Sequence, residues 1–151
     1  MFTSREFFSE GAWQAKVKSP LEMVASAVRA TGADTTDSFT LAQKVTDMGE
    51  PLYGKQEPTG FKDAAETWLN TASVVARIAF ANALVGGQVP GVRIDKARFA
   101  GKDAPGIAHD LLNRDASPET LAAIEKGLGS RPESAGPVIG LVIASPEFQK
   151  R

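Results

Sequence analysis

Apolar residues recur at helical spacing along most of the chain. Leu21, Val24 and Val28 fall on one helix face, and Ser19 before them is a typical N-cap. No stretch alternates apolar and polar residues between hairpin turns, as a half-buried strand would. The pattern therefore predicts an all-α fold, a single-domain helical bundle of about six to seven helices.

Capping residues, prolines and glycines give the expected boundaries. The predicted helices are 4–17, 20–31, 38–48, 63–85, 104–114, 118–128 and 137–144. Segments 49–62 and 86–103 are rich in proline and glycine and are expected to be loops. We expect 63–85 to be the central helix, because its second half is apolar on every side apart from Arg77 and Asn82.

Composition fits one globular domain spanning residues 1–151. The chain is 42% hydrophobic and 23% charged, and its 17 basic and 18 acidic residues are interspersed. This balance argues against a nucleic-acid partner, which would need a basic surface. No apolar run approaches the roughly 20 residues of a membrane span. The first residues lack the basic start and apolar stretch of a signal peptide.

The sequence offers no familiar catalytic or metal-binding motif. It has no cysteine and one histidine, which excludes thiolate zinc sites and covalent haem attachment. Glu6 and Glu10 are four residues apart, but neither belongs to a Glu-x-x-His pair. His109 is expected to face solvent, and Gly86-Gly87 ends a helix instead of forming a phosphate loop. We therefore expect no metal and no cofactor, identify no catalytic residue, and lean against an enzyme for this chain alone.

Arg77 is the most unusual residue, because it is the only charge in 74–85. A buried guanidinium needs an acidic partner or carbonyl groups. Glu22 and Arg29 share a helix face at the border of the expected core. We predict that Arg77 is buried and pairs with Glu22. The alternative is an anion or carboxylate site built on Arg77 and Arg29.

Aromatic residues follow the first loop. Tyr53 and Phe61 lie in the segment 49–62, and Trp68 comes shortly after it. Aromatic side chains on such a loop can form a binding patch or can cover the core. The candidate binding residues are Arg77, Glu22, Arg29, Tyr53 and Trp68.

A short sequence echo links the two ends. Ser-Arg-Glu-Phe at 4–7 resembles Ser-Pro-Glu-Phe at 145–148, where it follows an apolar helix. Either the echo arose by chance, or the chain begins just after an equivalent helix of a longer protein. The second interpretation predicts uncovered apolar surface on 4–17 and 137–144.

Several motifs follow one another in a recognisable order. They lie at residues 1–8, 16–22, 26–30, 48–53, 58–61, 68–70, 76–80 and 141–149. Together they resemble the bacterial family catalogued as domain of unknown function 1800. The resemblance implies that the chain is the C-terminal portion of a longer architecture, with Met1 an internal methionine. Longer members resemble exported proteins, which leaves the compartment of this chain open.

A weaker similarity is to helical domains attached to bacterial c-type cytochromes, some of which end in an apolar helix followed by Ser-Pro-Glu-Phe-Gln. Without cysteine this chain cannot hold such a haem. We interpret the chain as a non-catalytic interaction or structural module. Its partner would be protein: the missing N-terminal portion or a second copy. The alternative is the C-terminal part of an enzyme whose catalytic residues lie in that missing portion.

Overall fold

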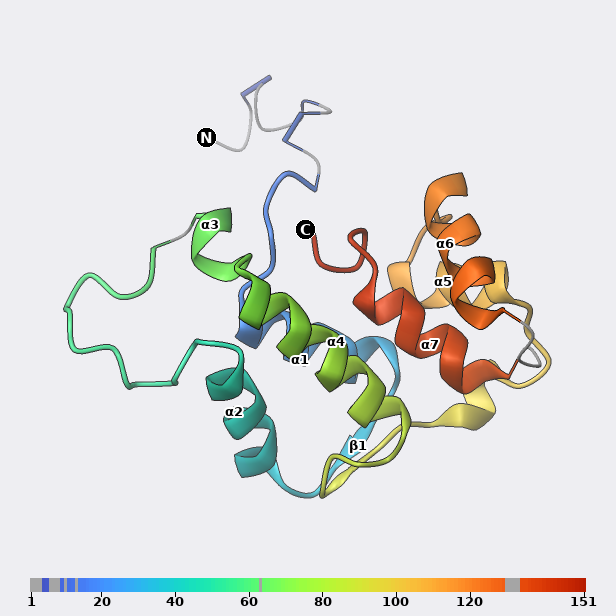
Figure 1. The fold of residues 1–151 in the computed structure, drawn as a ribbon, viewed down its shortest axis with the longest axis horizontal. Helices are drawn as coiled ribbons and strands as arrows, with labels where there is room; N and C mark the ends of the chain where they lie inside the picture. Colours follow the sequence, from blue (N-terminus) through green and yellow to red (C-terminus); the bar gives the residue numbers. More distant parts are fainter. Residues whose placement is uncertain (1–3, 6–8, 10, 13, 63, 130–133) are drawn as a thin grey trace.

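The structure, a computed structural model, describes residues 4–5, 9, 11–12, 14–62, 64–129 and 134–151. Helices dominate it (Figure 1). In chain order the elements are α1 (Pro20–Ala30), β1 (Asp34–Thr35), α2 (Ser38–Asp47), α3 (Ala65–Trp68), α4 (Thr71–Val85), β2 (Val92–Arg93), the 3-10 helix η1 (Lys96–Phe99), α5 (Ala104–Leu112), α6 (Pro118–Leu128) and α7 (Ala135–Ala144). The strands β1 and β2 pair antiparallel. The expected helical class is confirmed, with a single two-stranded sheet in the described part of the chain.

The helix α7 is the most enclosed element. It contacts α4, α5, α6 and η1, and α4 and α7 lie side by side across the middle of the molecule (Figure 1). Its buried residues are Val138, Ile139, Gly140, Val142 and Ile143. Gly136 allows a close approach to α4, because a Cβ added there would lie 3.3 Å from Val85 Cγ1. The core is therefore built on α7, with α4 as its main neighbour.

Local capping signals set the helix starts where the sequence predicted them. Ser19 and Glu22 form a capping box at α1, in which each side chain accepts from the other residue's backbone N–H. Asp37 caps α2, and Ser117 caps α6, whose two boundaries match the prediction. These helices were predictable because their start signals are contained in a few consecutive residues.

The expected helix 63–85 is wrong as a single element, since it divides into α3 and α4. Its first residue, Asp63, lies outside the described residues. Asn70 interrupts the helix because its side chain accepts a 2.9 Å hydrogen bond from the Ser73 N–H, while Ser73 Oγ accepts from the Asn70 N–H at 3.2 Å. Asparagine favours such a cap over a helix interior, where it competes with the backbone for hydrogen bonds.

The helix α4 crosses the middle of the molecule (Figure 1), as expected of a central helix, but it is not covered on every side. Its residues Val74, Val75 and Ile78 are 40%, 61% and 44% exposed. Phe80, Ala81 and Leu84 on the opposite side are buried. The helix therefore crosses the molecule as an element with one face in the core and one apolar face open.

The structure differs from two further predictions. The expected loop 86–103 contains β2 and η1, which are too short to show a periodicity of their own. The expected helix 4–17 lies partly outside the described residues. Its last four residues, 14–17, are not helical, and Val17 instead forms an antiparallel bridge with Lys150.

Candidate functional site

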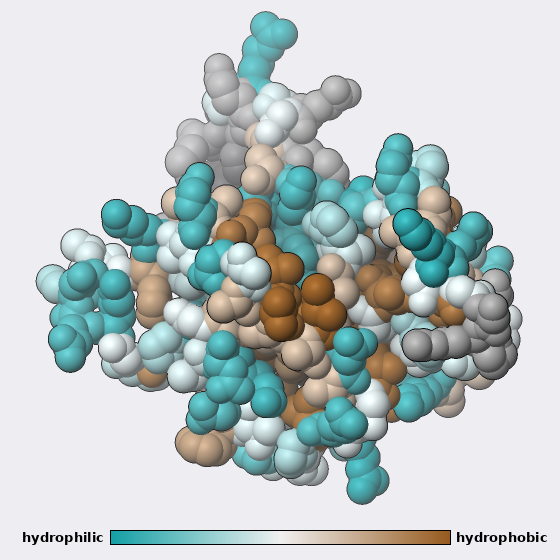
Figure 2. All heavy atoms as spheres, viewed as in Figure 1, coloured by the Kyte–Doolittle hydropathy of each residue, from teal (hydrophilic) through white to brown (hydrophobic). Residues whose placement is uncertain are grey.

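An apolar groove lies beside the open face of α4, between that helix and the residues that follow α7. It has a volume of about 260 Å³, and its lining residues are Val17, Leu69, Val74, Arg77, Ile78, Ala144, Pro146, Gln149 and Lys150. Figure 2 shows hydrophobic side chains gathered at the centre of this face, over α4. We call it the α4 groove. It holds Arg77, one of the candidate residues from the sequence.

Residues 145–151, the C-terminal segment, form one wall of the groove. Backbone hydrogen bonds pair this segment with residues 16–18. The Arg151 N–H donates to Lys16 O at 2.8 Å and the Lys18 N–H donates to Gln149 O at 2.8 Å. Val17 and Lys150 are the bridge partners between these bonds. The groove is therefore assembled from three regions that are far apart in sequence.

Arg77 is buried, as predicted, with 2% of its surface exposed. Its Nη1 donates to Gln149 Oε1 at 2.5 Å and its Nη2 donates to Lys18 O at 2.8 Å. Its buried Nε has no hydrogen-bond partner. Burial lowers the pKa of Arg77, and the charge of Glu50 only partly opposes this. The guanidinium is thus held by neutral acceptors.

The predicted pairing of Arg77 with Glu22 is wrong. Glu22 Oε1 lies 2.6 Å from Arg151 Nη2, and Glu22 Oε2 accepts from the Ser19 N–H at 2.9 Å. Both carboxylate oxygens are therefore occupied at the start of α1. The capping box of α1 holds the carboxylate there, and an amide takes its place beside Arg77.

Lys18 links the same two segments through its side chain. Its Nζ donates to Phe148 O at 2.6 Å and lies 4.1 Å from the centre of the Phe148 ring. Burial lowers the pKa of Lys18 to about 8, against the attraction of Glu22 and with a further contribution from the like charge of Arg151. Lys18 therefore joins residues 16–18 to the C-terminal segment through both its backbone and its side chain.

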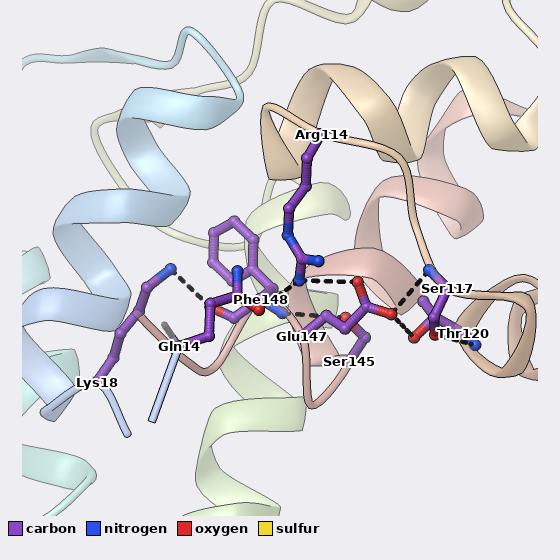
Figure 3. A network of polar contacts seen from close by, with 8 residues as sticks. All are labelled: Gln14, Lys18, Arg114, Ser117, Thr120, Ser145, Glu147 and Phe148. Atoms are coloured by element: carbon purple, nitrogen blue, oxygen red, sulfur yellow. Dashed lines mark hydrogen bonds and ion pairs between the residues drawn. The ribbon is translucent and has the colours of Figure 1, made fainter. Parts of the chain in front are cut away.

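Glu147 holds the C-terminal segment to the other half of the molecule (Figure 3). Its Oε1 accepts from the Ser117 N–H at 2.9 Å and from Thr120 Oγ1 at 2.7 Å. Its Oε2 lies 2.9 Å from Arg114 Nη2, which also donates to Gln14 Oε1 at 2.6 Å. Burial alone would raise the pKa of Glu147, but the hydrogen bonds from Ser117 and Thr120 and the charge of Arg114 outweigh it and lower the pKa.

The other candidate residues lie away from the groove. Arg29 borders a separate hollow between α1 and α2. Tyr53 is fully exposed on its loop, with a positive φ of 59°. Trp68 is buried, and its ring centre lies 5.5 Å from that of Phe61. The structure thus brings Trp68 and Phe61 together over the core, and brings neither Arg29 nor Tyr53 to Arg77.

Of the residues that line the groove, only Arg77 was a candidate from the sequence, and the polar side chains of Gln149 and Lys150 were missed. Gln149 fixes Arg77 and also donates through Nε2 to Ile143 O at 2.8 Å. The only sequence signal was the run Ser-Pro-Glu-Phe-Gln after the apolar helix, which marked the segment without indicating its partners. A contact across 72 positions leaves no periodicity that could predict it.

Histidine and acidic side chains are the groups of this chain that could bind a metal ion or act in catalysis. His109 is exposed, with Nδ1 3.0 Å from Asp115 Oδ1. Glu6 and Glu10 lie outside the described residues. Within the described ranges, no group of three or more histidine, aspartate or glutamate side chains could hold a metal ion. No helix in those ranges has the length and apolar character needed to cross a membrane.

Similarity to a known family extends over nearly the whole chain. Residues 1–150 match the family model described as "Protein of unknown function (DUF1800)". This confirms the resemblance drawn from the sequence motifs. No curated protein and no solved structure matches the chain.

Proposed function

The chain belongs to the DUF1800 family, and we propose that it is an interaction module: a helical domain that binds another polypeptide in the α4 groove and performs no chemistry of its own. The observation that carries this proposal is the exposure of Val74, Val75 and Ile78 on the helix beside the groove. Clustered apolar surface of this kind marks interaction sites more often than scattered single residues do.

The partner is the rest of a longer family architecture, of which this chain is the C-terminal portion. Two parts of one architecture would share an apolar face of this kind. A second copy of the chain is the competing occupant. The alternative function, the C-terminal part of an enzyme, keeps the same groove and differs only in what the covering portion does.

A hydrophobic fluorescent dye tests whether the groove is an open apolar site. The double variant Val74→Glu/Ile78→Glu places two charges in it. We expect dye fluorescence to fall several-fold in this variant, because charged side chains disfavour apolar binding. Phe39→Glu is the matched control: Phe39 is 75% exposed on α2, outside the groove. Equal dye binding by the groove variant and the control would contradict the proposal.

Sedimentation velocity then identifies the class of partner. A dimer that the double variant dissociates would show that a second copy occupies the groove. A monomer that retains groove-dependent dye binding would favour the rest of the architecture. Dimerisation insensitive to the double variant would place the interaction elsewhere and would count against the α4 groove.

A further inference from the structure

Lys18 is firmly anchored just before the start of α1. Its N–H donates to Gln149 O at 2.8 Å, and its Nζ donates to Phe148 O at 2.6 Å. Its own carbonyl accepts from Nη2 of Arg77, which is buried. At this residue the chain is therefore fixed both to the C-terminal segment and to α4.

Residues 14–17, which we call the strap, are held less firmly. Among their side chains only Val17 is buried, whereas the other three are partly or fully exposed. Lys16 and Arg151 exchange two backbone hydrogen bonds, at 3.2 and 2.8 Å. A segment that buries little apolar surface and relies on such peripheral hydrogen bonds opens at a lower free energy than the core does.

Gln14 fixes the far end of the strap. Its Oε1 accepts from Arg114 Nη2 at 2.6 Å (Figure 3). Its backbone has a φ of 52°, which lies in the left-handed region that is unfavourable for residues other than glycine. Release of this end would break the hydrogen bond and would also relieve the unfavourable backbone conformation. The anchor at Gln14 is therefore weaker than the anchor at Lys18.

The strap contributes to the α4 groove through Val17. This residue lines the groove together with Ile78 of α4 and Pro146 of the C-terminal segment. The other lining residues belong to α4, to the residues beside it or to the C-terminal segment, so release of the strap would remove only the wall that Val17 forms. The groove is complete only while the strap is docked.

We propose that the strap is releasable: it is hinged at Lys18, completes the α4 groove when it is docked, and removes one wall of the groove when it leaves the C-terminal segment. This inference rests on the proposed function and adds a regulation of binding. A polypeptide that contacts Val17 in the groove stabilises the docked strap. By linkage, docking of the strap strengthens the binding of that polypeptide by the same factor.

Thiol labelling measures release of the strap, because the chain has no cysteine of its own. Val17→Cys and Val142→Cys each place one thiol at a buried position, the second within α7. We expect iodoacetamide to alkylate the thiol of Val17→Cys at least about tenfold faster, because local release exposes it without global unfolding. Adding Gln14→Ala should accelerate this labelling about fivefold, through loss of one hydrogen bond, and should leave the labelling of Val142→Cys unchanged.

Equal labelling rates for the two thiols would show that the strap opens only when the whole fold unfolds, and would overturn the inference. Labelling of Val17→Cys that Gln14→Ala does not accelerate would overturn it as well. In that case the thiol would be accessible in the docked strap, and its reaction would not report release.

Amide hydrogen exchange tests the coupling between strap and groove. The probe is the hydrophobic dye, at ten times its dissociation constant. If the dye binds only while the strap is docked, exchange of the Lys16 N–H should slow about tenfold. Lys16 suits this measurement because its N–H donates to Arg151 O and it does not line the groove. The control is the Thr36 N–H, which donates to Gly91 O in another part of the fold and should exchange at an unchanged rate.

The outcomes separate this inference from the proposed function. Dye binding that Val74→Glu/Ile78→Glu abolishes, without slower exchange at Lys16, would overturn the coupling and leave the interaction module standing. Equal dye binding by wild type and this variant would contradict the proposed function, and the coupling would fail with it.

Discussion

Two arginines reach the C-terminal segment from opposite sides and find different partners. Arg114 meets the carboxylate of Glu147 at 2.9 Å, whereas Arg77 meets the amide oxygen of Gln149 at 2.5 Å. The first contact neutralises the guanidinium. The second holds it in place without neutralising it. The comparison shows that a satisfied hydrogen bond and a compensated charge are separate properties, and only Arg114 has both.

The two contacts also differ in their surroundings. Glu147 connects the C-terminal segment to the start of α6 through Ser117 and Thr120, so its ion pair belongs to a closed network (Figure 3). Arg77 lines a groove, and its hydrogen bonds go to neutral acceptors. The Glu147 network therefore joins two parts of the fold through an ion pair, while Arg77 joins α4 to residues 18 and 149 through hydrogen bonds alone.

The largest effect is expected from Glu147→Ala. It removes the acceptor for Ser117 and Thr120 and leaves Arg114 without its counter-charge. The side chains of Arg114 and Glu147 are 30% and 15% exposed, so the pair is only partly buried. We therefore expect the free energy of unfolding to fall by about 2 kcal/mol. Urea denaturation measures this. Glu125→Ala, an exposed glutamate on α6, is the control. A loss below about 1 kcal/mol would mean that the contacts of Glu147 contribute little to the stability of the fold.

A smaller effect separates the two arginines directly. Arg114→Met leaves the Glu147 carboxylate without its ion pair, while Arg77→Met leaves behind only neutral acceptors and removes an uncompensated cation. We expect Arg114→Met to cost about 1 kcal/mol more than Arg77→Met in urea denaturation. If Arg77→Met lowered the free energy of unfolding as much as Arg114→Met or more, the proposed difference between an arginine in an ion pair and one bound by neutral acceptors would be contradicted.

The smallest effect is a change in acid sensitivity. In the folded chain the pKa of Glu147 lies below its ordinary value of 4.5. The unfolded chain therefore binds the proton first as the pH falls, so this stabilisation is complete above pH 4.5 and is lost as the pH falls through the folded pKa. Glu147→Gln should lose less stability than wild type over that interval in urea titrations. Arg77→Met should keep the wild-type profile, and a flattened profile there would be unexpected.

Much of the fold could be predicted from local signals. Ser19, Asp37 and Ser117 mark helix starts within a few residues, so α1, α2 and α6 emerged with nearly correct boundaries. Asn70 was missed because the apolar residues on both sides suggest one continuous helix. The deciding interaction there is a reciprocal cap with Ser73, which a hydrophobic pattern does not register.

The candidate site was only half predictable. The isolation of Arg77 in an apolar segment correctly indicated a buried cation in need of partners. The identity of those partners depends on how residues 18 and 149 meet in space, and Glu22 looked suitable only because its local role at Ser19 and its contact with Arg151 were unknown. A sequence can indicate that a buried charge needs polar partners, whereas tertiary structure determines which groups provide them.

The pairing of residues 16–18 with the C-terminal segment has a mechanical consequence. Lys16 lies opposite Arg151, and Lys18 lies opposite Gln149. The chain therefore connects to α1 and to α7 at the same end of this ladder. Force that separates the two segments would break its hydrogen bonds one after another, starting with those between Lys16 and Arg151. Arg77 donates to both segments at the inner end, through Lys18 O and Gln149 Oε1. The ion pair between Arg151 and Glu22 would resist this opening at the outer end, and Arg77 would resist it at the inner end, before α1 and α7 begin to separate.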